Sequence, residues 1–79
     1  MDLERQDLAL HSVHKFLEGT DTPFSDLKLV WFAKVLKNWK AIVADIGEGG
    51  NLYEVTYSGE FNDINVDEYE KINSYREQL

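Results

Sequence analysis

The sequence predicts a small α+β fold in which an antiparallel meander sheet is packed by an N-terminal and a C-terminal helix, in the order α-β-β-β-(β)-α. Two observations support this fold class. Apolar residues recur with helical spacing near both ends of the chain, whereas the middle contains strand-rich apolar runs separated by short turn signals. A chain of 79 residues is near the size of one hydrophobic core, so we expect a single domain over residues 1–79.

The first helix is predicted over residues 3–18. Asp2 can cap its start, and Gly19 can end it. Its apolar stripe consists of Leu3, Leu10, Val13 and Leu17. We expect a loop at residues 20–23, because Pro23 disfavours helical geometry in the residue before it.

Residues 27–46 form the densest apolar run and allow two interpretations. In a helix, one face would contain Leu29, Phe32, Leu36, Trp39 and Val43. In a β-hairpin, a break at Lys37 and Asn38 would join two strands, and one face of the first strand would contain Leu29, Trp31, Ala33 and Val35. The abundance of Val, Ile, Trp and Phe, with an asparagine at the break, favours the hairpin.

The second half of the chain starts with a glycine-rich loop at residues 47–50, followed by the clearest strand at residues 51–57. A turn at Ser58 and Gly59 leads to a short edge strand at residues 61–65. The residues that we expect in the core of the sheet are Trp31, Tyr53, Val55 and Tyr57.

A last helix is predicted because Asn65, followed three residues later by Glu68, has the pattern of a capping box. The apolar stripe of this helix would contain Val66, Tyr69, Ile72, Tyr75 and Leu79.

The composition restricts the classes of function. A net charge of −7 disfavours nonspecific binding to nucleic acid or to an anionic membrane, because both need a cationic surface. The absence of cysteine excludes disulfides and thiolate metal sites, which suits a reducing cytoplasm. The N-terminus lacks the apolar segment of a signal peptide, and no apolar run is long enough to span a membrane. A single small core also argues against a deep substrate cavity, and therefore against an enzyme.

Three motifs over residues 28–71 resemble a family of short uncharacterised phage and prophage proteins of Gram-positive bacteria. The motifs are Val30-Trp31-x-x-Lys34-x-Leu36-x-Asn38-Trp39-Lys40-Ala41, then Leu52-Tyr53-Glu54-Val55-Thr56-Tyr57-x-Gly59, then Asp67-x-Tyr69-x-Lys71. The sequence departs from the family pattern at Leu52, Ser58 and Glu70, where the family has tyrosine, asparagine and lysine. The resemblance implies a phage-encoded accessory protein in the cytoplasm of a bacterial host, and it implies no particular activity, cofactor or partner.

The sequence predicts neither a metal site nor a catalytic pair of carboxylates. His11 and His14 have a spacing that can place two ligands on one metal, but no third ligand is apparent, so surface histidines are the preferred interpretation. A catalytic carboxylate pair would need one buried and one ionised group beside a cleft, whereas the candidates read as solvated residues or caps: Glu54, Asp63, Asp67 and Glu68. We therefore predict no catalytic residue, no metal and no cofactor.

The predicted binding site is a lysine-rich cluster around the hairpin turn, formed by Lys34, Lys37, Asn38, Trp39 and Lys40. These residues suit a contact with another protein. In the structural alternative, Trp39 closes the core over the turn while the lysines keep the hairpin soluble and protect its edge. Lysines beside an aromatic ring also suit weak binding of single-stranded nucleic acid, which the overall negative charge opposes.

The acidic second half of the chain carries an alternative hypothesis. Its carboxylates would replace nucleic-acid phosphates on a host defence or replication protein, and the residues concerned are Glu54, Glu60, Asp63, Asp67, Glu68 and Glu70. In the simpler interpretation, these acids only maintain solubility.

The sequence thus predicts a non-enzymatic cytoplasmic accessory protein that binds a host or phage protein. Homodimerisation is compatible with this prediction, because a short chain with an open sheet edge gains buried surface by self-association.

Overall fold

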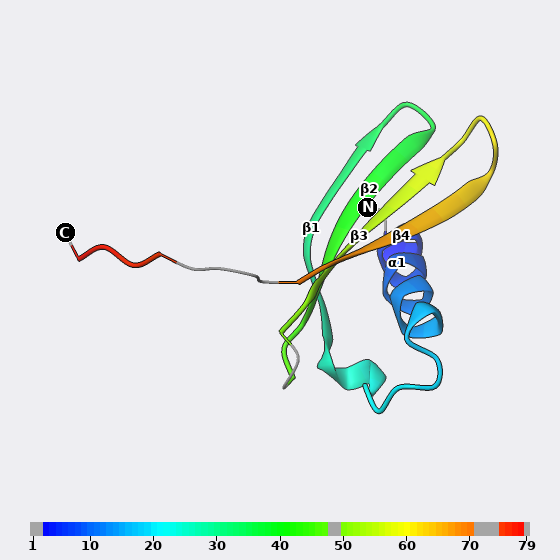
Figure 1. The fold of residues 1–79 in the computed structure, drawn as a ribbon. Helices are drawn as coiled ribbons and strands as arrows, with labels where there is room; N and C mark the ends of the chain where they lie inside the picture. Colours follow the sequence, from blue (N-terminus) through cyan, green and yellow to red (C-terminus); the bar gives the residue numbers. More distant parts are fainter. Residues whose placement is uncertain (1–2, 48–49, 71–74, 79) are drawn as a thin grey trace.

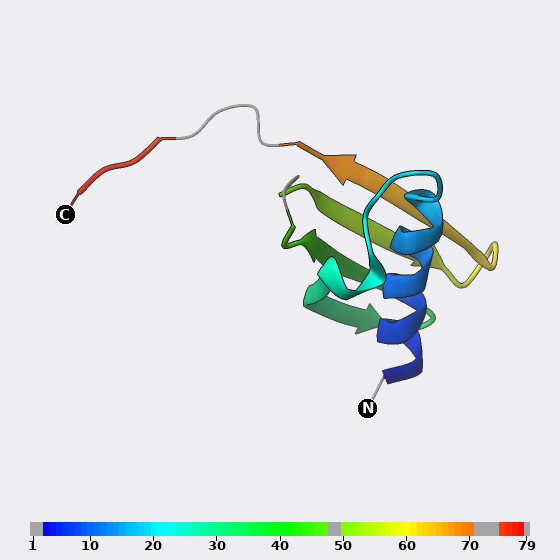
Figure 2. The ribbon, with the colours of Figure 1, turned by 90° about the horizontal axis from the view of Figure 1, so that it is seen from below.

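The computed structural model describes residues 3–47, 50–70 and 75–78, which contain one α-helix and one four-stranded sheet. The elements are helix α1 (Leu3–Phe16), a short 3-10 turn η1 (Phe24–Asp26), and strands β1 (Leu27–Val35), β2 (Asn38–Asp45), β3 (Leu52–Ser58) and β4 (Asp63–Tyr69). The strands pair antiparallel in chain order, and α1 crosses one face of the sheet (Figures 1 and 2). The predicted α+β class, the meander and the hairpin over residues 27–46 are confirmed.

Helix α1 is held to the sheet by a stripe of small apolar side chains. Ala9, Val13 and Leu17 recur every four residues and are buried, which places them on one face of the helix. The chain leaves the helix where the backbone N–H of Thr20 donates to the carbonyl of Leu17 at 2.9 Å, next to Gly19 with a positive φ of 93°. The stripe is therefore as predicted at Val13 and Leu17, although the helix itself ends at Phe16.

The core lies between α1 and the two central strands. Trp39, Ala41 and Val43 of β2 and Tyr53 and Val55 of β3 are all buried against the helix. Tyr53 and Val55 confirm the predicted core, and Tyr57 packs against it while half-buried. Because side chains alternate along a strand, the residues between them point to the opposite face of the sheet.

We call that opposite side the open face, since α1 packs on the other side of the described sheet (Figures 1 and 2). The register of the four strands places on it Lys28, Trp31, Ala33, Val35, Asn38, Lys40, Ile42, Ala44, Leu52, Glu54, Thr56, Ser58, Asp63, Asn65, Asp67 and Tyr69.

A β-bulge in β1 decides on which face of the sheet Trp31 lies. Leu29 pairs with Val43 and Trp31 pairs with Ile42, so that Val30 is an extra residue between two consecutive pairs. An extra residue reverses the alternation of side chains beyond it. Trp31 is therefore on the open face and 50% exposed, and the prediction that it belongs to the core is wrong.

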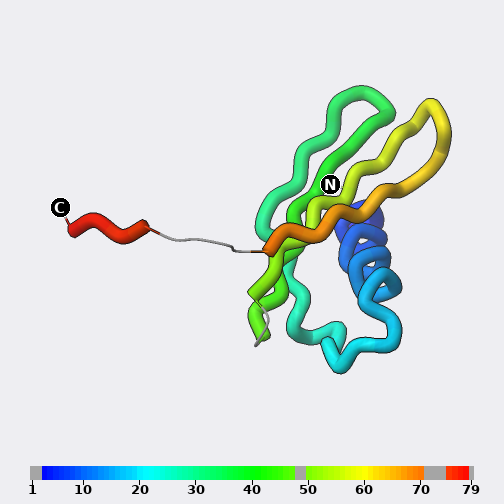
Figure 3. Tube along the Cα trace, in the orientation of Figure 1, coloured from blue at the N-terminus to red at the C-terminus, as the bar shows by residue number. Residues whose placement is uncertain are grey.

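The two hairpin tips, residues 36–37 and residues 59–62, lie at the same end of the sheet (Figures 1 and 3). The first turn is made by Leu36 and Lys37, and Leu36 has a positive φ of 56°. The backbone N–H of Gly59 donates to Oδ1 of Asn38 at 2.9 Å, which joins the tips. A Cβ atom at Gly59 would overlap the Lys37 carbonyl oxygen, so glycine is needed for this close approach.

Strand β4 replaces both the short edge strand and the start of the predicted last helix. Val66 and Tyr69, expected on a helix stripe, are strand residues, and Tyr75 lies at residues 75–78, which form no regular element. Ile72 and Leu79 lie outside the described residues. The strand is favoured over the helix because Ile64 and Val66 pair with apolar residues on β3. Nδ2 of Asn65 donates to Oδ2 of Asp67 at 2.9 Å and does not cap a helix.

Candidate functional site

Trp39, the aromatic member of the predicted lysine-rich cluster, belongs to the core. Its side chain is 4% exposed, and its ring lies 5.6 Å from the ring of Phe32 and 5.6 Å from that of Tyr57, with which it stacks. Neither face of the indole is therefore free to stack a nucleic-acid base. The prediction of Trp39 as an exposed contact residue is wrong, and the alternative, in which it closes the core, describes its position.

Lys34 and Lys37 line a groove of about 840 Å³ between the hairpin tips and the start of α1. Both lysines are exposed. Arg5 adds a third cationic side chain to this groove, and Glu4 adds a carboxylate. Two of the predicted contact residues therefore do share a surface, on the helix side of the sheet.

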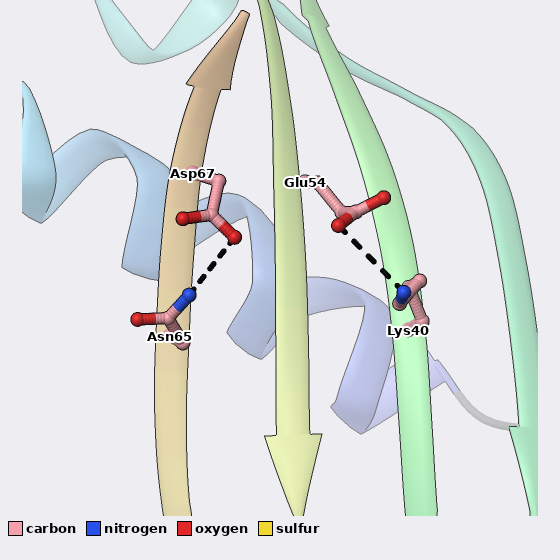
Figure 4. A network of polar contacts seen from close by, with 4 residues as sticks. All are labelled: Lys40, Glu54, Asn65 and Asp67. Atoms are coloured by element: carbon pink, nitrogen blue, oxygen red, sulfur yellow. Dashed lines mark hydrogen bonds and ion pairs between the residues drawn. The ribbon is translucent and has the colours of Figure 1, made fainter.

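The other two members of the cluster have separate roles. Asn38 accepts the hydrogen bond that joins the hairpin tips, so its side chain is structural. Lys40 is on the open face, where its Nζ lies 3.6 Å from Oε1 of Glu54 (Figure 4). Both side chains of this ion pair are partly exposed, so it contributes at most about 1 kcal/mol to stability. The predicted cluster is thus divided between two faces of the sheet.

The apolar half of the open face was missed by the sequence reasoning. It is formed by Trp31, Val35 and Ile42 on β1 and β2, and Val35 is 69% exposed. A shallow groove of about 360 Å³ runs beside Trp31, Val35 and Lys40. A regular alternation starting at the buried Leu27 and Leu29 would place Trp31 inside, and the bulge at Val30 carries no glycine that could have signalled it.

The β3–β4 half of the open face has three carboxylates. Glu54 on β3 pairs in register with Asp67 on β4, and Asp63 lies farther along β4. Figure 4 looks onto this half, with α1 behind the sheet, and shows Glu54 directed to Lys40 and Asp67 held by Asn65. Three of the six acidic residues proposed for nucleic-acid mimicry therefore share one face with an exposed tryptophan.

The remaining acids of that set do not join them. Glu68 lies on the helix side of β4, where its Oε2 accepts hydrogen bonds from the hydroxyl of Tyr53 at 3.1 Å and from Nδ2 of Asn51 at 3.2 Å. Burial, together with the nearby Glu68 carboxylate, raises the pKa of Tyr53 above its usual value of 10.0. Glu60 and Glu70 are exposed, in the second turn and after β4.

The two histidines contact an aromatic side chain. The ring of His11 stacks on Phe24 at 4.6 Å, and that of His14 meets Phe24 edge-on at 5.6 Å. Nε2 of His11 also lies 3.4 Å from Oδ2 of Asp7. In the described part of the chain, no three histidine, aspartate or glutamate side chains are grouped so that they could hold a metal ion. The histidines thus help to seat η1 against α1.

The helical segments of the described residues are too short or too polar to cross a membrane.

Comparison with known proteins gives one match. The model of a family described as "Family of unknown function (DUF6275)" matches residues 6–78. No curated protein and no solved structure is significantly similar to the chain.

Proposed function

Because the chain belongs to DUF6275, a family of unknown function, we propose from its surface that it is a non-enzymatic accessory protein that binds another protein. The partner is a host or phage protein, and the contact is made by the open face of the sheet. The resemblance of its three motifs to short phage and prophage proteins supports a phage or prophage origin, and with it the cytoplasm of a bacterial host as the site of action.

One observation carries this proposal: the sheet presents an exposed tryptophan on a face that α1 does not cover. Single exposed apolar residues are common on protein surfaces. Here Trp31 is flanked in register by Ile42, and Val35 extends the apolar surface along the same strand. Tryptophan is enriched at the centre of protein interfaces, where one large ring removes much apolar surface from water.

The conformation of Leu36 supports a contact role for the neighbouring hairpin tip. Leu36 is 84% exposed and has a φ of 56°, which glycine or asparagine adopts at lower cost than leucine. An exposed leucine in this conformation stabilises neither the core nor the turn. A partner that buries its side chain would explain its presence.

Affinity purification from host-cell extract tests the proposal. The bait proteins are the wild type, Trp31→Ala and the matched control Phe61→Ala, which removes an exposed aromatic ring from the second turn. We expect the wild type and Phe61→Ala to capture the same partner and Trp31→Ala to lose it. Capture of the same partner by all three proteins would contradict a contact through the open face.

A second candidate function is acidic inhibition of a host defence or replication protein. It is favoured by the position of Glu54, Asp63 and Asp67 on one face. A salt series in the same purification separates the two candidates. Capture through carboxylates alone weakens steeply as ionic strength rises, whereas capture through Trp31 and its apolar neighbours persists.

A further inference from the structure

We propose that the open face binds a basic amphipathic helix, whose apolar side chains cover the Trp31 half while its lysines or arginines cover the carboxylate half. This inference rests on the proposed protein-binding function and names the chemistry of the partner. It is carried by two rows of side chains across the sheet, each with an apolar residue on β1 and a carboxylate on β4.

The rows follow from the strand register. One row runs from Trp31 through Ile42 to Glu54 and Asp67, so it passes from an indole to two carboxylates. The row at the tip end also starts with an apolar residue, Val35 on β1, and ends with a carboxylate, Asp63 on β4. The row between these two contains Lys40 and no carboxylate, and the row at the opposite end of the strands runs from Lys28 to Tyr69. Between the Trp31 row and the hairpin tips, a partner lying along the strands would therefore meet apolar side chains on β1 and carboxylates on β4.

The size of the face fits one helix. Three strand spacings of about 4.8 Å separate β1 from β4, which gives a width of about 14 Å. A helix with its side chains is about 10–12 Å wide, so a single helix spans both halves. The opposite face of the same sheet is already covered by one helix, α1 (Figure 2). A second helix would complete a three-layer arrangement of helix, sheet and helix.

The carboxylates on the open face favour a partner with cationic side chains. Neither β3 nor β4 contains a lysine or arginine. Lys40 on β2 reaches Glu54, whereas Asp67 and Asp63 lie on the far strand, where Asn65 offers only an amide to Asp67. An apolar partner would remove these carboxylates from water without compensation, which is costly. Lysine or arginine side chains at the acidic flank would supply that compensation.

A second copy of this chain does not fit the face. If two sheets stack about a two-fold axis along the strands, the Trp31 half of each copy lies over the carboxylate half of the other. If the axis runs across the strands, Glu54 and Asp67 face the same carboxylates of the second copy. Either arrangement buries charge against an apolar surface or against like charge. The open face is therefore suited to a different protein.

Designed peptides test the inference directly. The probe is a fluorescein-labelled helical peptide of 14 residues, the length of α1, with leucines on one face and lysines on the other. Two further peptides serve as controls: one has the same composition in scrambled order, and the other has glutamate in place of lysine. Fluorescence anisotropy with the wild-type protein should show saturable binding of the first peptide and none of the controls.

Paired variants locate the binding site. Glu54→Gln/Asp67→Asn removes two charges from the open face, and Glu60→Gln/Glu70→Gln removes two charges outside it, so both variants have the same net charge. We expect the first variant to bind the leucine-lysine peptide at least about tenfold more weakly and the second to bind within about twofold of the wild type. Equal effects of the two variants would overturn the inference, because binding would then follow net charge alone.

The same variants, used as baits in host-cell extract, separate this inference from the proposed function. If the partner is lost with Trp31→Ala but retained with Glu54→Gln/Asp67→Asn, the open face binds a protein and the basic helix is wrong. If the partner is retained with Trp31→Ala as well, both proposals are wrong. Loss with Trp31→Ala and with Glu54→Gln/Asp67→Asn, and retention with Glu60→Gln/Glu70→Gln, is the result that we expect.

Discussion

Tyr53 combines a buried ring with a hydroxyl that donates to Glu68, and this environment raises its pKa. Below the unfolded-state pKa of about 10, the phenol is neutral in both states and its full contribution to stability is present. Above about pH 10, the unfolded chain loses this proton before the folded chain does. The free energy of unfolding should therefore fall as the pH rises through the raised pKa of Tyr53.

Urea unfolding at about pH 9 and about pH 11 measures this effect. We expect the Tyr53→Phe variant to lose less stability over that interval than the wild type, because phenylalanine has no proton to release. Tyr75→Phe is the control, since Tyr75 is exposed, and it should behave as the wild type does. Equal losses in all three proteins would show that Tyr53 is not the group responsible.

At Leu36, a substitution should increase the stability of the protein. Leu36→Asn should raise the free energy of unfolding by about 0.5–1 kcal/mol, because asparagine tolerates the positive φ better than leucine does. Leu36→Ala keeps the unfavourable conformation and controls for the loss of an exposed apolar side chain. A gain that is as large for alanine as for asparagine would mean that the backbone conformation is not the cause.

For single residues, the sequence correctly predicts that Tyr53 and Val55 belong to the core, because buried and less buried side chains alternate along β3 at these positions. It predicts Trp31 in the core and Trp39 at the contact site, whereas Trp31 is exposed and Trp39 is buried. The exposure of Trp31 depends on one extra residue in β1, and the burial of Trp39 on the alternation along β2. A bulge is stabilised by tertiary pairing and by the twist of the sheet. Val30 lies in a run of strand-forming residues, and its residue type does not distinguish it from a regular strand residue.

Among the elements, the first helix, the hairpin and the third strand can be predicted from periodicity and turn residues. The end of the chain cannot. From Ile64 to Tyr69, apolar residues fit both a spacing of two and a helical spacing, and the capping-box pattern at Asn65 favours the helix locally. The pairing of Val66 on β4 with Val55 on β3 stabilises the strand over the helix, and this contact between distant residues cannot be read from the sequence.

The contact between the hairpin tips can be tested at Gly59. Gly59→Ala should destabilise the protein by about 1–3 kcal/mol, because its Cβ would lie 2.5 Å from the Cβ of Lys37 and would push the tips apart. Asn38→Ala, which removes only the hydrogen bond between the tips, should cost about 1 kcal/mol. Thermal or urea unfolding measures both changes. If Gly59→Ala has the stability of the wild type, the tips are not packed as described.

For the whole molecule, the dominant property is an excess of negative charge. A net charge of −7 on 79 residues produces repulsion within the folded protein, and added salt screens it. We expect the melting temperature at neutral pH to rise between about 0.02 M and about 0.3 M sodium chloride. Near pH 4.6, the isoelectric point, the same change of salt should have little effect. A melting temperature that is independent of salt at pH 7 would contradict this account.

The fold class of the whole molecule follows from the sequence, but the face that we propose for binding does not. Within residues 3–47, 50–70 and 75–78, a single helix leaves one side of the sheet open, and this could not be foreseen while a second helix was expected at the C-terminus. The predicted lysine-rich cluster is divided for the same reason that Trp39 is buried: neighbouring residues of a strand point to opposite faces.

Both proposals require that Trp31 is exposed on the open face and that Trp39 is buried beneath the helix. The most direct measurement is acrylamide quenching of the single-tryptophan variants Trp39→Phe and Trp31→Phe, each at low protein concentration. We predict that Trp31, observed in Trp39→Phe, emits at long wavelength and is strongly quenched, whereas Trp39, observed in Trp31→Phe, emits at shorter wavelength and is protected. Protection of Trp31 together with quenching of Trp39 would contradict the bulge, the open face and the binding function built on them.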